Sequence, residues 1–278
     1  YYESSDINND QKAFGHISEH TIGLSLGAAW IFRESFINRF NGRLLNMHAT
    51  RLPQNRGGGG FSWQIMRKDK LGSSLIHQVD TGIDSGNMIL YSEFLYPMSC
   101  RIPEDYEKYS FQQNVQFFDK LLSKIKSQSD FRYTGQPEYL SIYWPRLNTP
   151  KHAFVDWNWQ LAHIESFIDA FDDPYQGAAT FINERKIFLK DCYADYNDGL
   201  FHPFQQGIIY RKTDDFLFVS TVEGTLVVKT VLNEEGGNIL NTIRIGDRFF
   251  TPLKYLESAK LFRAIYTSEG LKKGYNAL

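Results

Sequence analysis

Residues 43–84, RLLNMHATRLPQNRGGGGFSWQIMRKDKLGSSLIHQVDTGID, decide how the rest of the chain is interpreted. The apolar run at 43–47 predicts a buried strand, 61–66 a short helix and 73–78 a second strand, with a Pro/Gly-rich loop after the first strand. Asn46 and His48 are two residues apart, so their side chains point to one face of that strand. Asp84 lies in the loop that follows the second strand. The stretch therefore predicts a reaction centre that combines an amide, an imidazole and a carboxylate.

The flanking segments predict the architecture around this centre. Residues 21–26 form an apolar run typical of a buried strand, and residues 30–40 carry a helical apolar stripe that Asn41-Gly42 ends. Strand, helix and strand in this order make a βαβ unit, which implies parallel pairing. Further strands and a long helix are expected at 88–94 and 106–127. We predict an α/β fold with a Rossmann-like, doubly wound, mostly parallel sheet, whose carboxyl edge binds ligands.

The first fifteen residues, YYESSDINNDQKAFG, are polar and without a period, so a loop is expected there. Too little chain precedes the strand at 43–47 to supply the earlier βα units of a doubly wound sheet. We therefore expect the first units of the fold to be missing from this chain.

The sequence pattern changes in the second half of the chain. Residues 128–155 read as a linker, because they hold three prolines and no sustained period. A helix at 159–171 then precedes short strands separated by turns, which predict a small OB-like β-barrel. The expected strands are 180–183, 186–192, 207–211, 216–221 and 225–232. The domains are thus 1–127, catalytic and incomplete at its start, the linker 128–155, and the barrel 156–278.

Composition bounds the class of protein. The chain has 278 residues, 42% of them hydrophobic, which is enough to form a buried apolar core. Its net charge of −2 does not indicate the basic surface that nucleic-acid binding needs. No apolar run is long enough to cross a bilayer, and no secretory signal opens the chain. Cys100 and Cys192 lack the spacing of a disulfide framework or zinc knuckle. His16 and His20 have no third ligand, so no metal site is expected. A cytoplasmic setting is predicted.

The chemistry of the three central residues suggests acyl transfer without a covalent intermediate. Asn46 could donate to a developing oxyanion, and His48 could take a proton near neutral pH while Asp84 orients it. No Ser or Cys nucleophile is obviously placed, so direct attack by an amine or water fits. Spacing alone leaves an ordinary hydrogen-bonded Asn/His pair and a merely flexible RGGGG loop open. His77 is interpreted as structural.

The order of these motifs resembles the tetrahydrofolate-dependent formyltransferase family. The matching residues are Asn46 and His48, Leu52-Pro53, Arg56-Gly57 and Asp84-Ser85-Gly86. A second stretch, VDWNWQLAHIESFIDAFDDPYQGAATF, resembles the start of the C-terminal domain of methionyl-tRNA and sugar formyltransferases. Together the two stretches cover most of the chain.

The resemblance implies 10-formyltetrahydrofolate as formyl donor and a direct attack by an acceptor amine. His48 would remove the amine proton, Asn46 would hold the oxyanion, and Asp84 would orient His48. A cis Leu52–Pro53 peptide is also implied. The pterin would lie against two segments, mostly through backbone groups of Ala28, Ala29, Trp30 and Ile31 and of Gln78, Val79, Asp80 and Thr81. The acceptor would approach the loop that holds Arg56, Gly57, Gly58, Phe61 and Trp63.

A nucleotide-linked amino sugar, of the kind used in lipopolysaccharide biosynthesis, is the favoured acceptor. Residues 151–278 hold 14 Lys and Arg against 17 Asp and Glu, a net charge of −3, whereas a domain that grips tRNA should be basic. The YWPRLNT and DPYQGAATF segments also resemble the sugar enzymes. Other amines, methionyl-tRNA, a formyltetrahydrofolate hydrolase and a non-catalytic folate-binding module stay open. A homodimer is one candidate for the assembly.

Overall fold

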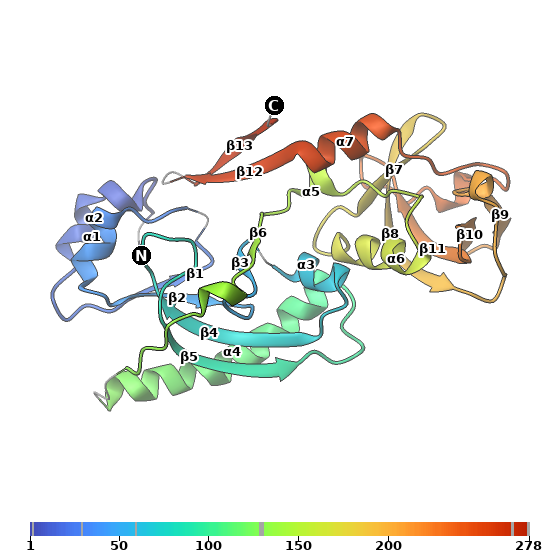
Figure 1. Ribbon diagram of the computed structural model, residues 1–278. Helices are drawn as coiled ribbons and strands as arrows, with labels where there is room; N and C mark the ends of the chain where they lie inside the picture. The colour runs from blue at the N-terminus through green and yellow to red at the C-terminus, as the bar shows by residue number, and fades with distance from the viewer. Residues whose placement is uncertain (2, 29, 59, 128–130, 268–269, 277–278) are drawn as a thin grey trace.

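The structure is a computed structural model that describes residues 1–278 except 2, 29, 59, 128–130, 268–269 and 277–278. A sheet with helices and a β-barrel lie next to one another, and a C-terminal arm runs from the barrel back over the sheet half (Figure 1). Among the described residues, no helix has both the length and the apolar character needed to span a bilayer.

The first sheet has the order β1-β2-β4-β5 among the described strands. β1 and β2 are parallel, and α2 lies between them in the chain, as the βαβ prediction required. β2 with β4 and β4 with β5 are antiparallel, so the expectation of a mostly parallel sheet does not hold for these strands. The short connection from β4 to β5 has no room for a crossover helix, which accounts for the antiparallel pairing of these two strands. The strands are β1 (Gly23–Leu26), β2 (Leu44–His48), β4 (Leu71–Gln78) and β5 (Met88–Leu95).

Helices cover this sheet with apolar side chains. Helix α4 (Pro103–Lys126) packs Phe117 and Leu121 against Leu45 and Ile76 of the sheet. On the other side the predicted helix at 30–40 is shorter, consisting of α2 (Glu34–Ile37) and the 3₁₀ turn η2 (Asn38–Phe40). Asn41 ends it in the left-handed conformation, as expected. Residues 30–33, the start of the predicted helix, are not helical. Trp30, Ile31 and Phe32 line the cavity described below.

The start of the chain contains two short helices where a loop was expected. These are η1 (Ile7–Asn9) and α1 (Gln11–Gly15). The carboxylates of Asp6 and Asp10 accept backbone N–H groups of the turns that follow them. Such capping satisfies the free donors of a helix start without any apolar period in the sequence.

One helix and a five-stranded sheet form the main body of the described second half, which confirms the predicted C-terminal β domain. The strand order is β7-β8-β11-β10-β9, and all neighbours are antiparallel. Residues 247–250 bond to both edges, through Phe181↔Phe250 and Ile208↔Arg248, and close the sheet into a small barrel. The elements are α6 (Leu161–Ala170), β7 (Ala178–Ile182), β8 (Arg185–Asp195), β9 (Ile209–Lys212), β10 (Leu217–Ser220) and β11 (Thr225–Leu232), with the 3₁₀ turns η4 (Pro203–Gln205) and η5 (Leu240–Thr242).

One apolar core joins the two halves. Helix α3 (Phe61–Met66) packs on α6, and Ile65 shares a buried cluster with Ile164 and Ile168. The Ser62 hydroxyl donates to the Ala170 carbonyl at 2.7 Å across this contact. The barrel half therefore anchors the helix that follows the glycine loop.

The residues between the halves cross the first half. They include η3 (Glu138–Leu140), β6 (Tyr143–Trp144) and α5 (Thr149–His152). β6 pairs in parallel with β3 (Arg56–Gly57), so this segment fixes the glycine loop. The C-terminal arm, α7 (Leu253–Leu261), β12 (Phe262–Thr267) and β13 (Gly270–Asn276), was not predicted. Its Thr267 carbonyl accepts the Ile31 N–H at 2.9 Å.

Candidate functional site

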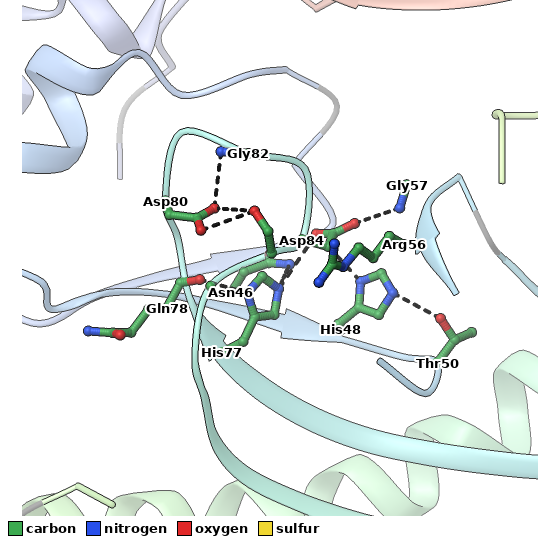
Figure 2. A network of polar contacts seen from close by, with 12 residues as sticks. Asn46, His48, Thr50, Arg56, Gly57, His77, Gln78, Asp80, Gly82 and Asp84 are labelled. Atoms are coloured by element: carbon green, nitrogen blue, oxygen red, sulfur yellow. Dashed lines mark hydrogen bonds and ion pairs between the residues drawn. The ribbon is translucent and has the colours of Figure 1, made fainter. Parts of the chain in front are cut away.

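Asn46, His48 and Asp84 lie together at one side of β2 (Figure 2). The two strand residues project into a shared cavity, and the loop after β4 brings the Asp84 carboxylate to them. The Nδ1 atom of His48 is 3.8 Å from Oδ1 of Asp84, and the two side chains are only 13% and 17% exposed. The structure thus gathers the three residues that the sequence singled out.

The hydrogen bonds of His48 determine which ring nitrogen is free. Its Nε2 lies 2.9 Å from the Asn55 carbonyl and 2.9 Å from Thr50 Oγ1. A carbonyl only accepts, so Nε2 carries the hydrogen and Nδ1 holds the lone pair that faces Asp84. Burial lowers the pKa of His48 and outweighs the opposing attraction of Asp84. The imidazole is therefore a free base at neutral pH.

Asp84 is held as a charged carboxylate. Burial alone would raise its pKa, but the neighbouring imidazoles of His77 and His48 and the Gly57 amide outweigh burial and lower the pKa to about 2. The Gly57 N–H donates to Oδ2 at 2.8 Å, which leaves Oδ1 turned toward the imidazoles. Asp84 has φ 52, a left-handed conformation that Asp tolerates better than most residues.

His77 is a residue of the site that sequence reasoning assigned to structure alone. It is 2% exposed, and its Nδ1 lies 2.7 Å from the Gln78 carbonyl, which fixes that hydrogen. The remaining nitrogen, Nε2, is 3.2 Å from Asn46 Nδ2 and 3.5 Å from Asp84 Oδ1. The antiparallel register places His77 directly opposite Asn46. The sequence predicted a mostly parallel sheet, and this antiparallel pairing of His77 with Asn46 was not predicted.

Two further residues were missed, Thr50 and Asn55, which hold the His48 ring. Both are 3% exposed, and Asn55 is itself fixed by Arg67, whose guanidinium donates to Oδ1 at 2.8 Å. The Leu52–Pro53 peptide lies between Thr50 and Asn55 in the chain. That peptide is cis, as the resemblance implied.

The predicted acceptor loop lines the cavity with one exception. Gly57, Gly58, Phe61 and Trp63 all contribute to the wall. Arg56 does not: its guanidinium is buried and bonds to Glu138 at 2.8 Å and to Gln136 Oε1 at 3.1 Å. The prediction that Arg56 contacts the acceptor is therefore not supported by its position, because its charge is already satisfied on the crossing segment.

Gln136 connects Arg56 to the loop of Asp84. Its Nε2 donates to the Asp84 carbonyl at 2.8 Å and to the Gly86 carbonyl at 2.7 Å. The side chain of Arg56 thus supports the backbone that carries the carboxylate.

The cavity has a volume of about 600 Å³, within the range of small-molecule sites. Five of the predicted donor-binding residues contribute to its wall: Ala28, Trp30, Ile31, Val79 and Asp80. Gln78 and Thr81 do not, since the Gln78 amide donates to the Gly42 carbonyl and Thr81 lies in an exposed turn; Ala29 is outside the described residues. Trp30 and Ile31 stay 41% and 39% exposed, which suits a flat, partly apolar ligand.

Comparison with known proteins agrees with this architecture. Residues 148–244 match the family model described as formyl transferase, C-terminal domain. The methionyl-tRNA formyltransferase of Ruminiclostridium cellulolyticum is 26% identical over 186 residues, 66% of this chain and 58% of that protein. Over about two thirds of its length the chain is similar to methionyl-tRNA formyltransferase. It spans less than two thirds of this relative's length.

Solved structures of formyltransferases share the fold. WlaRD, a sugar 3N-formyl transferase solved in the presence of dTDP and 5-N-formyl-THF, has a TM-score of 0.57 and 22% identity, covering 77% of this chain and 73% of its own. The N-formyltransferase from Helicobacter canadensis, solved with folinic acid and dTDP-3-aminofucose, has a TM-score of 0.56 and 19% identity, covering 77% and 75%.

Proposed function

We propose that this formyltransferase moves a formyl group from 10-formyltetrahydrofolate to the amine of a nucleotide-linked amino sugar. One observation carries the proposal: the unprotonated Nδ1 of His48 faces a cavity that also receives Asn46 and the charged Asp84. A base, a neutral donor and a carboxylate at this separation suit proton removal from an amine as it attacks an acyl carbon.

In this mechanism the bound folate supplies only the formyl carbon and a leaving nitrogen. His48 Nδ1 takes the proton of the acceptor amine as the new C–N bond forms. Asn46 Nδ2 is the neutral donor for the formyl oxygen as it gains charge. Asp84, at 3.8 Å, stabilises the imidazolium. The proton then passes to the folate nitrogen as its bond to the formyl carbon breaks, and His48 returns to the free base.

The donor side of the cavity fits a pterin-like ring. Trp30, Ile31 and Val79 provide apolar walls, and Ala28 and Asp80 also line the cavity. Exposed aromatic and aliphatic side chains around a concave site are typical of walls that a ligand covers.

The acceptor is argued from charge and from the proteins that share the fold. The net charge of −3 over residues 151–278 disfavours a phosphate-rich tRNA partner. Both structural neighbours were solved with dTDP or a dTDP-sugar. The similarity to methionyl-tRNA formyltransferase makes charged initiator tRNA the second candidate. We also infer a cytoplasmic location, which fits two buried free cysteines.

The proposal is tested by incubating the chain with 10-formyltetrahydrofolate and, separately, nucleotide-linked amino sugars, methionyl-tRNA, or no acceptor. Mass spectrometry of the products should show a formyl adduct on an amino sugar. Formylated methionyl-tRNA would move the assignment to the second candidate. Formate release without an acceptor would identify a hydrolase, and donor binding without any product would identify a binding module.

A further inference from the structure

We propose that His48, His77 and Asp84 form a binding site for one Zn²⁺ ion, and that an ion in this site stops formyl transfer. One ligand atom of each residue lies within 4.8 Å of the others. Oδ1 of Asp84 is 3.8 Å from His48 Nδ1 and 3.5 Å from His77 Nε2. Figure 2 shows both rings turned toward this carboxylate.

The other nitrogen of each ring already has the partner that metal-binding histidines use. His48 Nε2 donates to the Asn55 carbonyl at 2.9 Å, and His77 Nδ1 donates to the Gln78 carbonyl at 2.7 Å. Histidine ligands almost always donate their second N–H to a carbonyl or carboxylate, which fixes the tautomer and the ring direction. Here both rings are fixed with their lone pairs toward Asp84.

The donor set and spacing favour zinc over the hard cations. Two imidazoles and one carboxylate are typical zinc ligands, whereas Mg²⁺ and Ca²⁺ prefer oxygen alone. Ligands at about 2.1 Å from a tetrahedral ion lie about 3.4 Å apart. The separations of 3.5 and 3.8 Å to Asp84 need an approach of only a few tenths of an ångström. The ligand atoms lie up to 4.8 Å apart, so the two imidazoles must approach each other by more than this, through rotation of their side chains.

Asn46 occupies the place of a fourth ligand. Its amide nitrogen lies 3.2 Å from His77 Nε2 and donates to the lone pair that an ion would take. Rotation of the terminal amide would exchange this nitrogen for Oδ1, an oxygen that can ligate or accept a hydrogen bond from a metal-bound water. Zinc binding thus replaces the hydrogen bond between Asn46 and His77.

The effect on transfer rests on the proposed function. Zinc would use the His48 lone pair that the reaction needs for the amine proton, and it would turn the Asn46 donor away from the formyl oxygen. The ion therefore acts as a reversible inhibitor that competes with catalysis rather than as a cofactor.

Metal binding is tested first without any substrate. Purified chain, freed of metal by a chelator, is titrated with Zn²⁺ by calorimetry and with Co²⁺ by visible absorption, which reports a four-coordinate ion by its intense bands. We expect one site per chain, and at least a tenfold weaker site in His77→Gln. The matched control is His20→Gln, because His20 also lies beside a carboxylate, Glu19 at 3.3 Å, but on the exposed surface.

The results separate the alternatives. Weaker binding in His20→Gln but not in His77→Gln, or no uptake by the wild type, would overturn the site. Circular dichroism checks that His77→Gln is folded, and Asp84→Asn provides a second variant that should lose the Co²⁺ bands.

The second arm adds Zn²⁺ to the transfer assay. Each protein's rate with Zn²⁺ is divided by its own zinc-free rate. Chelator-reversible inhibition, with an inhibition constant for Zn²⁺ at least tenfold higher in His77→Gln than in the wild type, supports the regulatory role. Zinc bound at the site with undiminished transfer would overturn that role. If the chain binds zinc but transfers no formyl group to any acceptor, the proposed function fails while the metal site stands.

Discussion

Nε2 of His77 accepts a hydrogen bond from the amide of Asn46, at 3.2 Å, across the paired strands β4 and β2. Because the other ring nitrogen is fixed on the Gln78 carbonyl, Asn46 is held with its NH₂ group in one direction. The donor proposed for the formyl oxygen is therefore positioned by a neighbouring strand and not by β2 alone.

Replacing His77 should lower turnover through Asn46. His77→Leu removes the acceptor, and we expect kcat to fall by up to about 100-fold, since small misplacements of reacting groups cost this much. His77→Gln offers an amide oxygen to Asn46 and should recover part of the loss. Steady-state kinetics with chelator present would measure both, and melting curves would check the fold. Equal rates in the two variants would mean that His77 does not act through Asn46.

His48→Ala and Asp84→Ala should each lower turnover by about 10²–10⁴-fold, the usual range for a positioned acid–base group. The thermal midpoint should move little, because neither residue belongs to the apolar clusters. Residues that act as a unit are not additive, so the double variant should be no slower than about the slower single one. An unchanged rate in either single variant would remove the mechanism.

Local chemistry explains why much of the fold was predictable. The βαβ unit, the barrel strands and the Asn46/His48 pair follow from apolar periods and turn residues that act over a few positions. The register of β2 with β4 depends on how the chain folds back between the two strands, and no local sequence pattern predicts it. The role of His77 follows from that register, so it stayed hidden although His77 itself was noticed.

The C-terminal arm and Arg56 also depend on contacts between residues distant in the sequence, which local patterns do not predict. Helix α7 and strands β12 and β13 form an arm that reaches back to the first half, where the Thr267 carbonyl accepts the Ile31 N–H. Arg56 was assigned to the acceptor from its place in the loop. Its partners, Gln136 and Glu138, come from a segment 80 or more residues away, which only the folded chain brings to it.

The pH dependence of kcat/KM should follow His48. Its pKa is lowered, so the free base persists below the usual value of about 6.5, and activity should fall only at lower pH. His77 lowers and Asp84 raises this pKa through their charges. The acid limb should therefore move to higher pH in His77→Gln and to lower pH in Asp84→Asn. Shifts in the same direction in both variants would contradict this assignment.

Gly58 should tolerate no side chain. A Cβ atom there would lie 2.4 Å from Cα and 2.5 Å from N of Arg146, so the backbone of the crossing segment would have to move. Gly58→Ala should cost about 1–3 kcal/mol of folding free energy, as overpacking does, and lower activity. The matched control is Gly60→Ala in the same loop, where a Cβ meets nothing within 4 Å. Denaturant unfolding would compare them, and equal stability of the two variants would argue against the close contact.

Arg56 provides the last test, because sequence and structure assign it different roles. If it supports the Asp84 loop through Gln136, Arg56→Ala should lower kcat, by about tenfold, and leave the KM for the acceptor nearly unchanged. Arg56→Lys should not restore the rate, because an ammonium lacks the planar fork that reaches Gln136 and Glu138 together. Arg51→Ala is the control, since Arg51 forms a more exposed ion pair with Glu93 at 3.4 Å. A higher acceptor KM with unchanged kcat would instead return Arg56 to the acceptor site, since uniform loss of binding has that signature.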